Sequence, residues 1–171
     1  MTDERQGDQL WPALERLPRG SGIIIRHYSL PARQRRDLIA RIRPIARKRR
    51  LVTIVAGPPG LAVATRADGF HTRSQCPGPR HLVRTAAVHG LAELRLAERA
   101  RADLVFISPL FATASHPKGR TLGRVRFGRL ARQSRIPVIA LGGMNAGRAK
   151  SLRTFGIYGW AAIGALTPNR D

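Results

Sequence analysis

The sequence predicts an α/β fold built on parallel strands. Apolar runs of strand length recur along the chain, amphipathic helical patterns lie between them, and glycine-containing turns follow the last two runs. Continuous apolar runs are typical of strands buried on both faces of a parallel sheet. The strand–helix–strand spacing indicates βαβ units. Two architectures fit this pattern: a doubly wound open sheet and a (β/α)₈ barrel that is one unit short.

Seven segments are predicted strands, and one of them is weaker than the rest. The predicted strands are Gly22–Arg26, Leu51–Ala56, the weaker Ala67–His71, Leu82–Val88, Leu104–Ile107, Pro137–Leu141 and Trp160–Ile163.

Helical periodicity supplies the elements between the strands. In the helix expected over Ala32–Lys48, four apolar side chains share one face: Leu38, Ile39, Ile42 and Ile45. The same spacing predicts a helix over residues 91–102. Asn145 is a candidate N-cap for a helix over Ala146–Phe155, and Gly156 is its expected end.

Composition indicates one cytoplasmic domain that spans residues 1–171. The chain is 43% hydrophobic, so it can bury a core, and its formal net charge of +21 favours anionic partners. These partners include phosphorylated small molecules, and no recognition motif argues for nucleic acid. The polar N-terminus lacks an apolar signal core, and no apolar run reaches membrane-spanning length. Cys76 is the only cysteine, which excludes a disulfide framework.

Glycines after the last two predicted strands suggest a phosphate site. Gly142 and Gly143 precede a predicted helix, and Ile163–Gly164 repeats the arrangement at the next strand end. Glycine lets backbone N–H groups approach an anion, and a helix N-terminus attracts negative charge. Simple turn glycines are the competing interpretation, but the pair of sites favours phosphate binding.

Four stretches resemble the thiamine phosphate synthase family, which includes the thiazole tautomerases. They are IIIRHYS, ADGFH, SPLFATASHPKGRTLG and IPVIALGGMNAGRAKSLRTFGIYGWAAIGAL, and the resemblance covers roughly Gly22 to Leu166. It implies the TIM (β/α)₈ barrel rather than the open sheet. Because Thr2-Asp3 matches the segment that follows the family's first strand, the resemblance also implies that this strand is missing by N-terminal truncation.

The resemblance implies that hydroxymethylpyrimidine diphosphate is joined to thiazole phosphate, with release of diphosphate. Arg26 matches the family arginine that contacts the pyrimidine diphosphate and is the one candidate catalytic residue. The other candidate substrate-binding residues are Thr113, Ser115, Gly143, Ile163 and Gly164. Further possible site residues are His71, His89, His116 and Lys118.

The sequence departs from the family pattern where Mg²⁺ is expected. The family's two magnesium-binding aspartates would lie in Ala56–Pro59 and in His71–Arg80, and neither segment contains a carboxylate. Arg73 and Arg80 are candidates to contact the diphosphate directly. The tautomerase histidine would fall on Pro109, which disfavours that branch.

Two alternatives to an active synthase therefore stay open. One is a catalytically altered or inactive family member that binds a thiazole-type phosphate. The other is a basic nucleic-acid-binding protein, which the charge permits. Saturable binding of thiazole phosphate and salt-sensitive binding to any DNA would distinguish the two.

Overall fold

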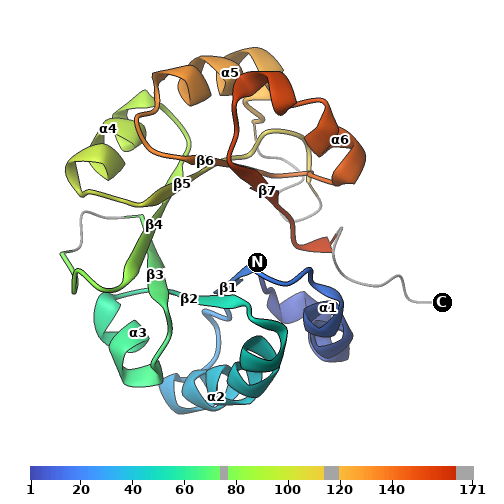
Figure 1. The fold of residues 1–171 in the computed structure, drawn as a ribbon, viewed down its shortest axis with the longest axis vertical. Helices are drawn as coiled ribbons and strands as arrows, with labels where there is room; N and C mark the ends of the chain where they lie inside the picture. Colours follow the sequence, from blue (N-terminus) through green and yellow to red (C-terminus); the bar gives the residue numbers. More distant parts are fainter. Residues whose placement is uncertain (74–76, 114–119, 165–171) are drawn as a thin grey trace. The chain divides into compact units, whose positions relative to one another are not determined.

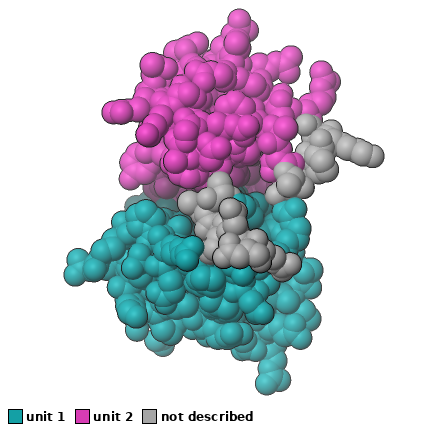
Figure 2. Space-filling view, turned by 90° about the vertical axis from the view of Figure 1, so that its right-hand side faces the viewer, with its two compact units in different colours: residues 1–71, 78–83, 163–171 teal, residues 72–77, 84–162 magenta. Residues whose placement is uncertain are grey.

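The computed structural model describes residues 1–73, 77–113 and 120–164 (Figure 1). The chain divides into two compact units, coloured separately in Figure 2. Unit 1 comprises residues 1–71, 78–83 and 163–171, and unit 2 comprises residues 72–77 and 84–162. Each unit contains parallel strands and helices, so the predicted α/β class is confirmed.

Unit 1 contains three parallel strands in the order β1–β2–β3. Ile24 of β1 pairs with Ile54 of β2, and Val55 of β2 pairs with Phe70 of β3. The elements are η1 (Glu4–Gln9), α1 (Leu10–Arg16), β1 (Gly22–Ile25), α2 (Ala32–Arg49), β2 (Val52–Ala56), α3 (Pro59–Thr65) and β3 (Gly69–Thr72), of which Thr72 belongs to unit 2.

The core of unit 1 lies between the strands and the helices α2 and α3, which cover one face of them in Figure 1. Ile39 and Ile42 of α2 are buried there against strand residues that include Ile25 and Val55. The predicted apolar stripe of α2 is thus the surface that attaches the helix. Burial of such side chains is the dominant favourable term in folding, at about 25 cal/mol per Å² of apolar surface.

Unit 2 contains four parallel strands in the order β4–β5–β6–β7. Its elements are β4 (Val83–Val88), α4 (Leu91–Arg99), β5 (Leu104–Ile107), α5 (Gly123–Gln133), β6 (Val138–Leu141), α6 (Ala146–Lys150), η2 (Arg153–Phe155) and β7 (Gly159–Ala161), with Val83 assigned to unit 1. A separate core forms here around Leu94, Val105 and Phe127.

Every predicted strand is present, with ends that shift by up to two residues. The helix expected over Ala146–Phe155 is wrong as one element, because α6 ends at Lys150 and a 3₁₀ turn follows. Ser151 explains the break: its hydroxyl donates to the Arg148 carbonyl at 2.8 Å and so competes with the backbone for that acceptor. Asn145 caps α6 as predicted, because its side chain accepts from the Arg148 N–H at 2.9 Å.

Three arginines at or just after helix ends adopt left-handed backbone conformations. Arg50 follows α2 with a φ of 53°, Arg66 follows α3 with a φ of 52°, and Arg101 lies just beyond α4 with a φ of 55°. Glycine is the usual residue at such positions, because a side chain makes this conformation unfavourable.

In the described part of the chain, no helix has the length and apolar character needed to cross a membrane.

Candidate functional site

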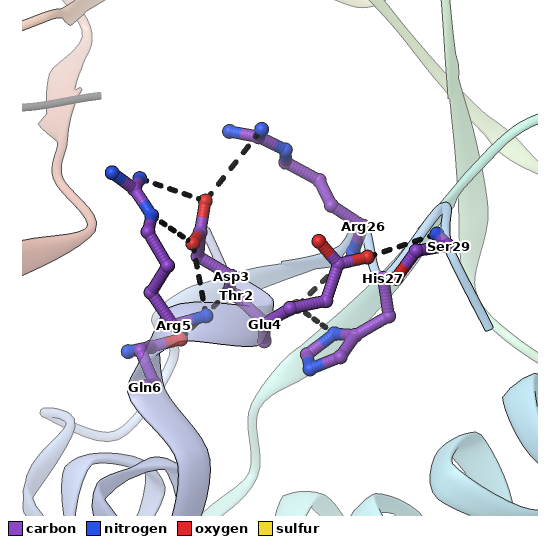
Figure 3. Close-up of polar contacts among 8 residues, drawn as sticks. All are labelled: Thr2, Asp3, Glu4, Arg5, Gln6, Arg26, His27 and Ser29. Atoms are coloured by element: carbon purple, nitrogen blue, oxygen red, sulfur yellow. Dashed lines mark hydrogen bonds and ion pairs between the residues drawn. The ribbon is translucent and has the colours of Figure 1, made fainter.

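The N-terminal segment of unit 1 lies along strand β1. The Thr2 N–H donates to the Ile24 carbonyl at 2.8 Å, and the Arg26 N–H donates to the Thr2 hydroxyl oxygen at 3.1 Å. Thr2 is 2% exposed. These contacts bring residues 2–6 beside residues 26–29, where β1 ends, as Figure 3 shows.

Asp3 connects two arginines at this position. Arg5 binds the Asp3 carboxylate through two hydrogen bonds. Its Nε donates to Oδ1 at 2.6 Å, and its Nη2 donates to Oδ2 at 3.0 Å. Arg26 Nη2 lies 3.7 Å from Oδ2, and the two side chains approach Asp3 from different elements in Figure 3. Hydrogen bonds from Arg5 hold the pKa of the Asp3 carboxyl below its ordinary value, so Asp3 is a carboxylate at neutral pH.

His27 packs behind Arg26 and has a structural role. The residue is 8% exposed, its Nδ1 lies 3.0 Å from the Thr2 hydroxyl oxygen, and its φ is 33°. Burial lowers the pKa of His27 below its ordinary 6.5. The imidazole is therefore neutral at pH 7 and adds no cation to the Arg26 cluster.

Arg35 is a residue that the sequence reasoning missed. It lies in the first turns of α2, yet its Nη2 donates to the Ala56 carbonyl at the end of β2 and lies 3.4 Å from the Ile25 carbonyl at the end of β1. Its guanidinium carbon is 5.3 Å from the centroid of the Tyr28 ring. No sequence signal distinguishes Arg35 from the neighbouring helical arginines, because only the packing of α2 brings it to the strand ends.

The positions where the family would hold Mg²⁺ do not fit a metal ion. Ala56–Pro59 carries no side-chain oxygen, and α3 begins there at Pro59, with Pro58 as its N-cap. Among the described residues, no group of three His, Cys, Asp or Glu side chains could hold a metal. Asp3, the nearest carboxylate to Arg26, is already bound by Arg5. Mg²⁺ requires several oxygen ligands, so the expected cofactor has no protein anchor in this region.

His71 occupies the end region of β3 and is 6% exposed. Its carbonyl accepts from the Gly57 N–H at 2.9 Å, which joins β3 to the loop that follows β2. Arg73 and Arg80 are both exposed, and their contact with the diphosphate stays a prediction. The role of His71 in substrate binding stays a prediction.

In unit 2, His89 and Ser108 meet after adjacent strands. His89 Nδ1 lies 2.6 Å from the Ser108 carbonyl oxygen and 3.4 Å from its hydroxyl oxygen. The short contact with the carbonyl requires a proton on Nδ1. Glu93 accepts from the His89 backbone N–H and holds the turn before α4.

Gly142 and Gly143 follow β6 and pack tightly against the loop after β5. Their φ angles are 98° and 60°. A Cβ on Gly142 would lie 2.8 Å from Pro109 Cα, and a Cβ on Gly143 would lie 2.4 Å from the Ala112 carbonyl oxygen. The double glycine is thus required by backbone packing, whether or not it also binds phosphate.

Arg148 adds a cation to this turn. Its Nη1 donates to the Gly143 carbonyl, and its guanidinium carbon lies 4.8 Å from the centroid of the Phe111 ring. Arg148 was not predicted as a site residue, because the sequence indicated only that a helix follows the two glycines. The contact with Phe111 connects it to the same loop that carries Thr113.

The predicted site residues therefore fall into separate groups. Arg26, His71, Ile163 and Gly164 lie in unit 1, and His89, Thr113 and Gly143 lie in unit 2. Ile163 and Gly164 follow β7, whose Ala161 pairs with Leu141 of β6. Ser115, His116 and Lys118 lie outside the described residues, as does Cys76.

The chemistry available at the described positions is that of anion binding. Guanidinium groups predominate around β1 and at the turn after β6, and they bind phosphate oxygens through planar, charge-assisted hydrogen bonds. Each unit thus offers cationic groups after its strands: Arg26 and Arg35 in unit 1, and Arg148 in unit 2.

Comparison with known proteins shows the family of nearly the whole chain. The family model described as thiamine monophosphate synthase matches residues 2–166. The match begins at Thr2 and therefore includes the segment that carries Asp3 and Arg5.

Individual relatives agree with the family match. The chain is 30% identical to a thiamine-phosphate synthase of Chlorobium phaeobacteroides, covering 100% of this chain and 88% of that protein. It is 30% identical to the enzyme of the same name from Moorella thermoacetica, covering 88% and 76%. Among solved structures, it is similar to thiamine phosphate pyrophosphorylase from Pyrococcus furiosus, with a TM-score of 0.81, 25% identity and coverage of 96% and 83%.

Proposed function

The chain belongs to the thiamine monophosphate synthase family, and on this premise we propose that it joins hydroxymethylpyrimidine diphosphate to thiazole phosphate. The product is thiamine phosphate, and diphosphate is released. The observation that carries the proposal is the family match over residues 2–166, which includes Arg26 at the end of β1. The family architecture that goes with this function is a (β/α)₈ barrel in one cytoplasmic domain.

The reaction needs charge stabilisation more than it needs a base. The bond between the pyrimidine-bearing carbon and the diphosphate oxygen breaks, and its electron pair leaves with the diphosphate. The thiazole nitrogen then supplies the electron pair of the new C–N bond. Negative charge grows on the leaving oxygen in the transition state, so fixed cations at that position lower the barrier.

Arg26 is the proposed ligand of the leaving diphosphate. Its side chain is 25% exposed, and its Nη2 lies 3.7 Å from Asp3, beyond the range of a good hydrogen bond. The guanidinium therefore keeps donors for an incoming anion while Asp3 orients it. A forked donor on a diphosphate contributes both charge and geometry.

The thiazole phosphate is assigned to the turn after β6. Gly143 would present its backbone to the phosphate there. Thr113, Ser115, Ile163 and Gly164 are the other substrate-binding residues that the family resemblance implies. Arg148, which donates to the Gly143 carbonyl, supplies a nearby positive charge. His89, His116 and Lys118 stay secondary candidates for the same ligand.

A second candidate function is binding of a thiazole-type phosphate without catalysis. The absence of carboxylates from Ala56–Pro59 and His71–Arg80 favours it, because the family's expected Mg²⁺ has no anchor there. Both candidate functions include binding of the thiazole phosphate. They differ in whether the protein also binds the pyrimidine diphosphate and releases diphosphate from it.

One assay separates the two candidates. The full chain is incubated with both substrates, with and without Mg²⁺, and thiamine phosphate is quantified by chromatography. Product formation above a no-protein control supports the synthase. Saturable binding of thiazole phosphate without product supports the second candidate, and failure to bind thiazole phosphate contradicts both.

A further inference from the structure

Arg35 is fixed at the ends of two strands by its own side chain. Nη2 donates to the carbonyl of Ala56, the last residue of β2, and approaches that of Ile25, the last residue of β1. Both carbonyls belong to strand backbone, so the guanidinium has a rigid support. The side chain comes from α2, so helix packing and strand pairing together set its position.

Arg35 Nη1 makes no hydrogen bond with the described residues, so it is the donor that another partner could accept from. Among the described residues, no carboxylate lies within ion-pair distance of Arg35, and its buried Nε has no hydrogen-bond partner. Burial also lowers the pKa of the guanidinium below its ordinary value. A partly buried cation without a directly paired carboxylate is costly, and an anionic ligand would relieve that cost.

The loop after β2 leaves room for Arg35 where the family resemblance places a metal-binding aspartate. A Cβ built on Gly57 would lie 3.7 Å from Arg35 Nη1, so a longer side chain at this position would compete for the same space. Gly57 has a φ of 136°, which also disfavours an aspartate there. A guanidinium thus lies beside the position that the metal ligand would occupy.

Tyr28 brings the two arginines into one cluster. The guanidinium carbons of Arg26 and Arg35 lie 6.0 Å and 5.3 Å from the centroid of its ring, and Tyr28 is 60% exposed. Cation–π contact orients both guanidinium groups without neutralising either. Two fixed positive charges beside one open ring form a site for a ligand with more than one anionic group.

Resting on the proposed function, we infer that Arg35 and Arg26 together bind the diphosphate of the pyrimidine substrate in place of a metal ion. During the reaction the C–O bond breaks, and its electrons pass to the diphosphate, whose added charge the two guanidinium groups stabilise. No proton and no further reactant is needed at this step. Arg35 is thereby a substrate-binding residue that sequence comparison does not identify.

Inorganic pyrophosphate is the probe for this site, measured by calorimetry on the full chain in EDTA. We expect Arg35→Gln to weaken its binding by about tenfold to hundredfold, the loss typical of a charge-assisted pair. Arg36→Gln is the matched control, because it removes the same charge from an exposed neighbour in α2. We expect the control to bind within threefold of wild type. Equal losses in both variants would overturn the inference.

Metal dependence gives an independent readout on the wild-type protein. We expect excess Mg²⁺ not to strengthen pyrophosphate binding, because the cations are already part of the protein. A gain of tenfold or more with Mg²⁺ would contradict the inference, since it would mean that the protein anchors the metal.

Chemical protection tests the site even if Arg35→Gln fails to fold. Wild-type protein is treated with phenylglyoxal, which modifies arginine, and the modified residues are identified by mass spectrometry. Pyrophosphate is expected to protect Arg26 and Arg35 while Arg36 continues to react. Unchanged modification of Arg35 would overturn the inference. Protection of Arg35 in a chain that does not bind thiazole phosphate would uphold this site and reject the proposed function alone.

Discussion

The Arg26 guanidinium lies 3.7 Å from the Asp3 carboxylate, close enough to be oriented and too far for a strong hydrogen bond. Asp3 is held more tightly by Arg5, at 2.6 Å. Arg26 is thus kept at the end of β1 with its hydrogen-bonding capacity still available. The role of Arg26 in ligand binding can therefore be tested by substitution.

Arg26→Ala is predicted to weaken the binding of hydroxymethylpyrimidine diphosphate by about tenfold to hundredfold, because it removes a charge-assisted pair worth about 1.5–3 kcal/mol. Thiazole phosphate, assigned to the turn after β6, should bind nearly as it does to wild type. Calorimetry with each ligand measures both effects. Arg33→Ala, an exposed position in α2, controls for loss of net charge. A parallel loss of both ligands in Arg26→Ala would indicate general damage instead.

Acid should destabilise the N-terminal cluster through Asp3. The pKa of Asp3 is lowered by hydrogen bonds from Arg5, so its contribution to stability is present above its ordinary pKa of 3.8 and is lost as pH falls through the lowered folded value. Asp3→Asn keeps the helix cap but loses the charge. We expect it to cost roughly 0.5–1.5 kcal/mol at pH 7 and little at pH 2.

Urea unfolding at several pH values measures this difference. Asp8→Asn is the control, since Asp8 is an exposed carboxylate in the same 3₁₀ helix. A deficit in Asp3→Asn that stays constant from pH 7 to pH 2 would show that the carboxylate does not titrate as described.

His27 should make stability depend on pH in a higher window. Burial lowers its folded pKa below 6.5, so the unfolded chain binds the proton first and the free energy of unfolding falls as pH drops below about 6.5. His27→Asn suits the φ of 33°, because asparagine tolerates left-handed backbone. Its unfolding free energy should decline less between pH 6.5 and 5 than that of wild type.

The exposed His81 provides the comparison for this experiment. His81→Asn should retain the wild-type pH dependence. If His27→Asn and His81→Asn decline equally with pH, the buried imidazole is not the source of the effect.

Gly143→Ala should destabilise the turn after β6. The new Cβ would lie 2.4 Å from the Ala112 carbonyl oxygen at a φ of 60°, so backbone must move. We expect a loss of at least about 1–3 kcal/mol in unfolding free energy and weaker thiazole phosphate binding. Thermal unfolding and calorimetry check the two effects.

Gly147→Ala is the matched change four residues later. Its Cβ would meet only the Asn145 side chain at an ordinary 3.5 Å, and alanine favours helix α6. The variant should be as stable as wild type or more so. A Gly143→Ala protein that is equally stable would refute the packing argument.

The strands could be predicted from the sequence because their signal is local. GIII, VTIVA and LVFI are continuous apolar runs, and each forms a buried parallel strand. The resemblance also assigned Arg26 to the end of its strand, where the structure has it. Both depend on the order of residues along the chain, which sequence displays directly.

The contacts that make the candidate site depend on tertiary packing. Arg35 resembles every other helical arginine until α2 packs on β1 and β2 and brings its guanidinium to their last carbonyls. Asp3 was recognised only as part of a matched segment, and its pairing with Arg5 requires the turn into η1. The break after Lys150 was missed because Ser151 is compatible with a helix by periodicity alone.

The three arginines with left-handed backbone conformations at the helix ends are positions where substitution could make the protein more stable and less prone to bind polyanions. Glycine at positions 50, 66 and 101 would relieve an unfavourable backbone conformation at each, and every substitution would also remove one charge from a chain with a net charge of +21. The three positions follow three different helices, so their gains should add. Heat tolerance and resistance to nonspecific association with polyanions would then improve together, because the same three substitutions act on both.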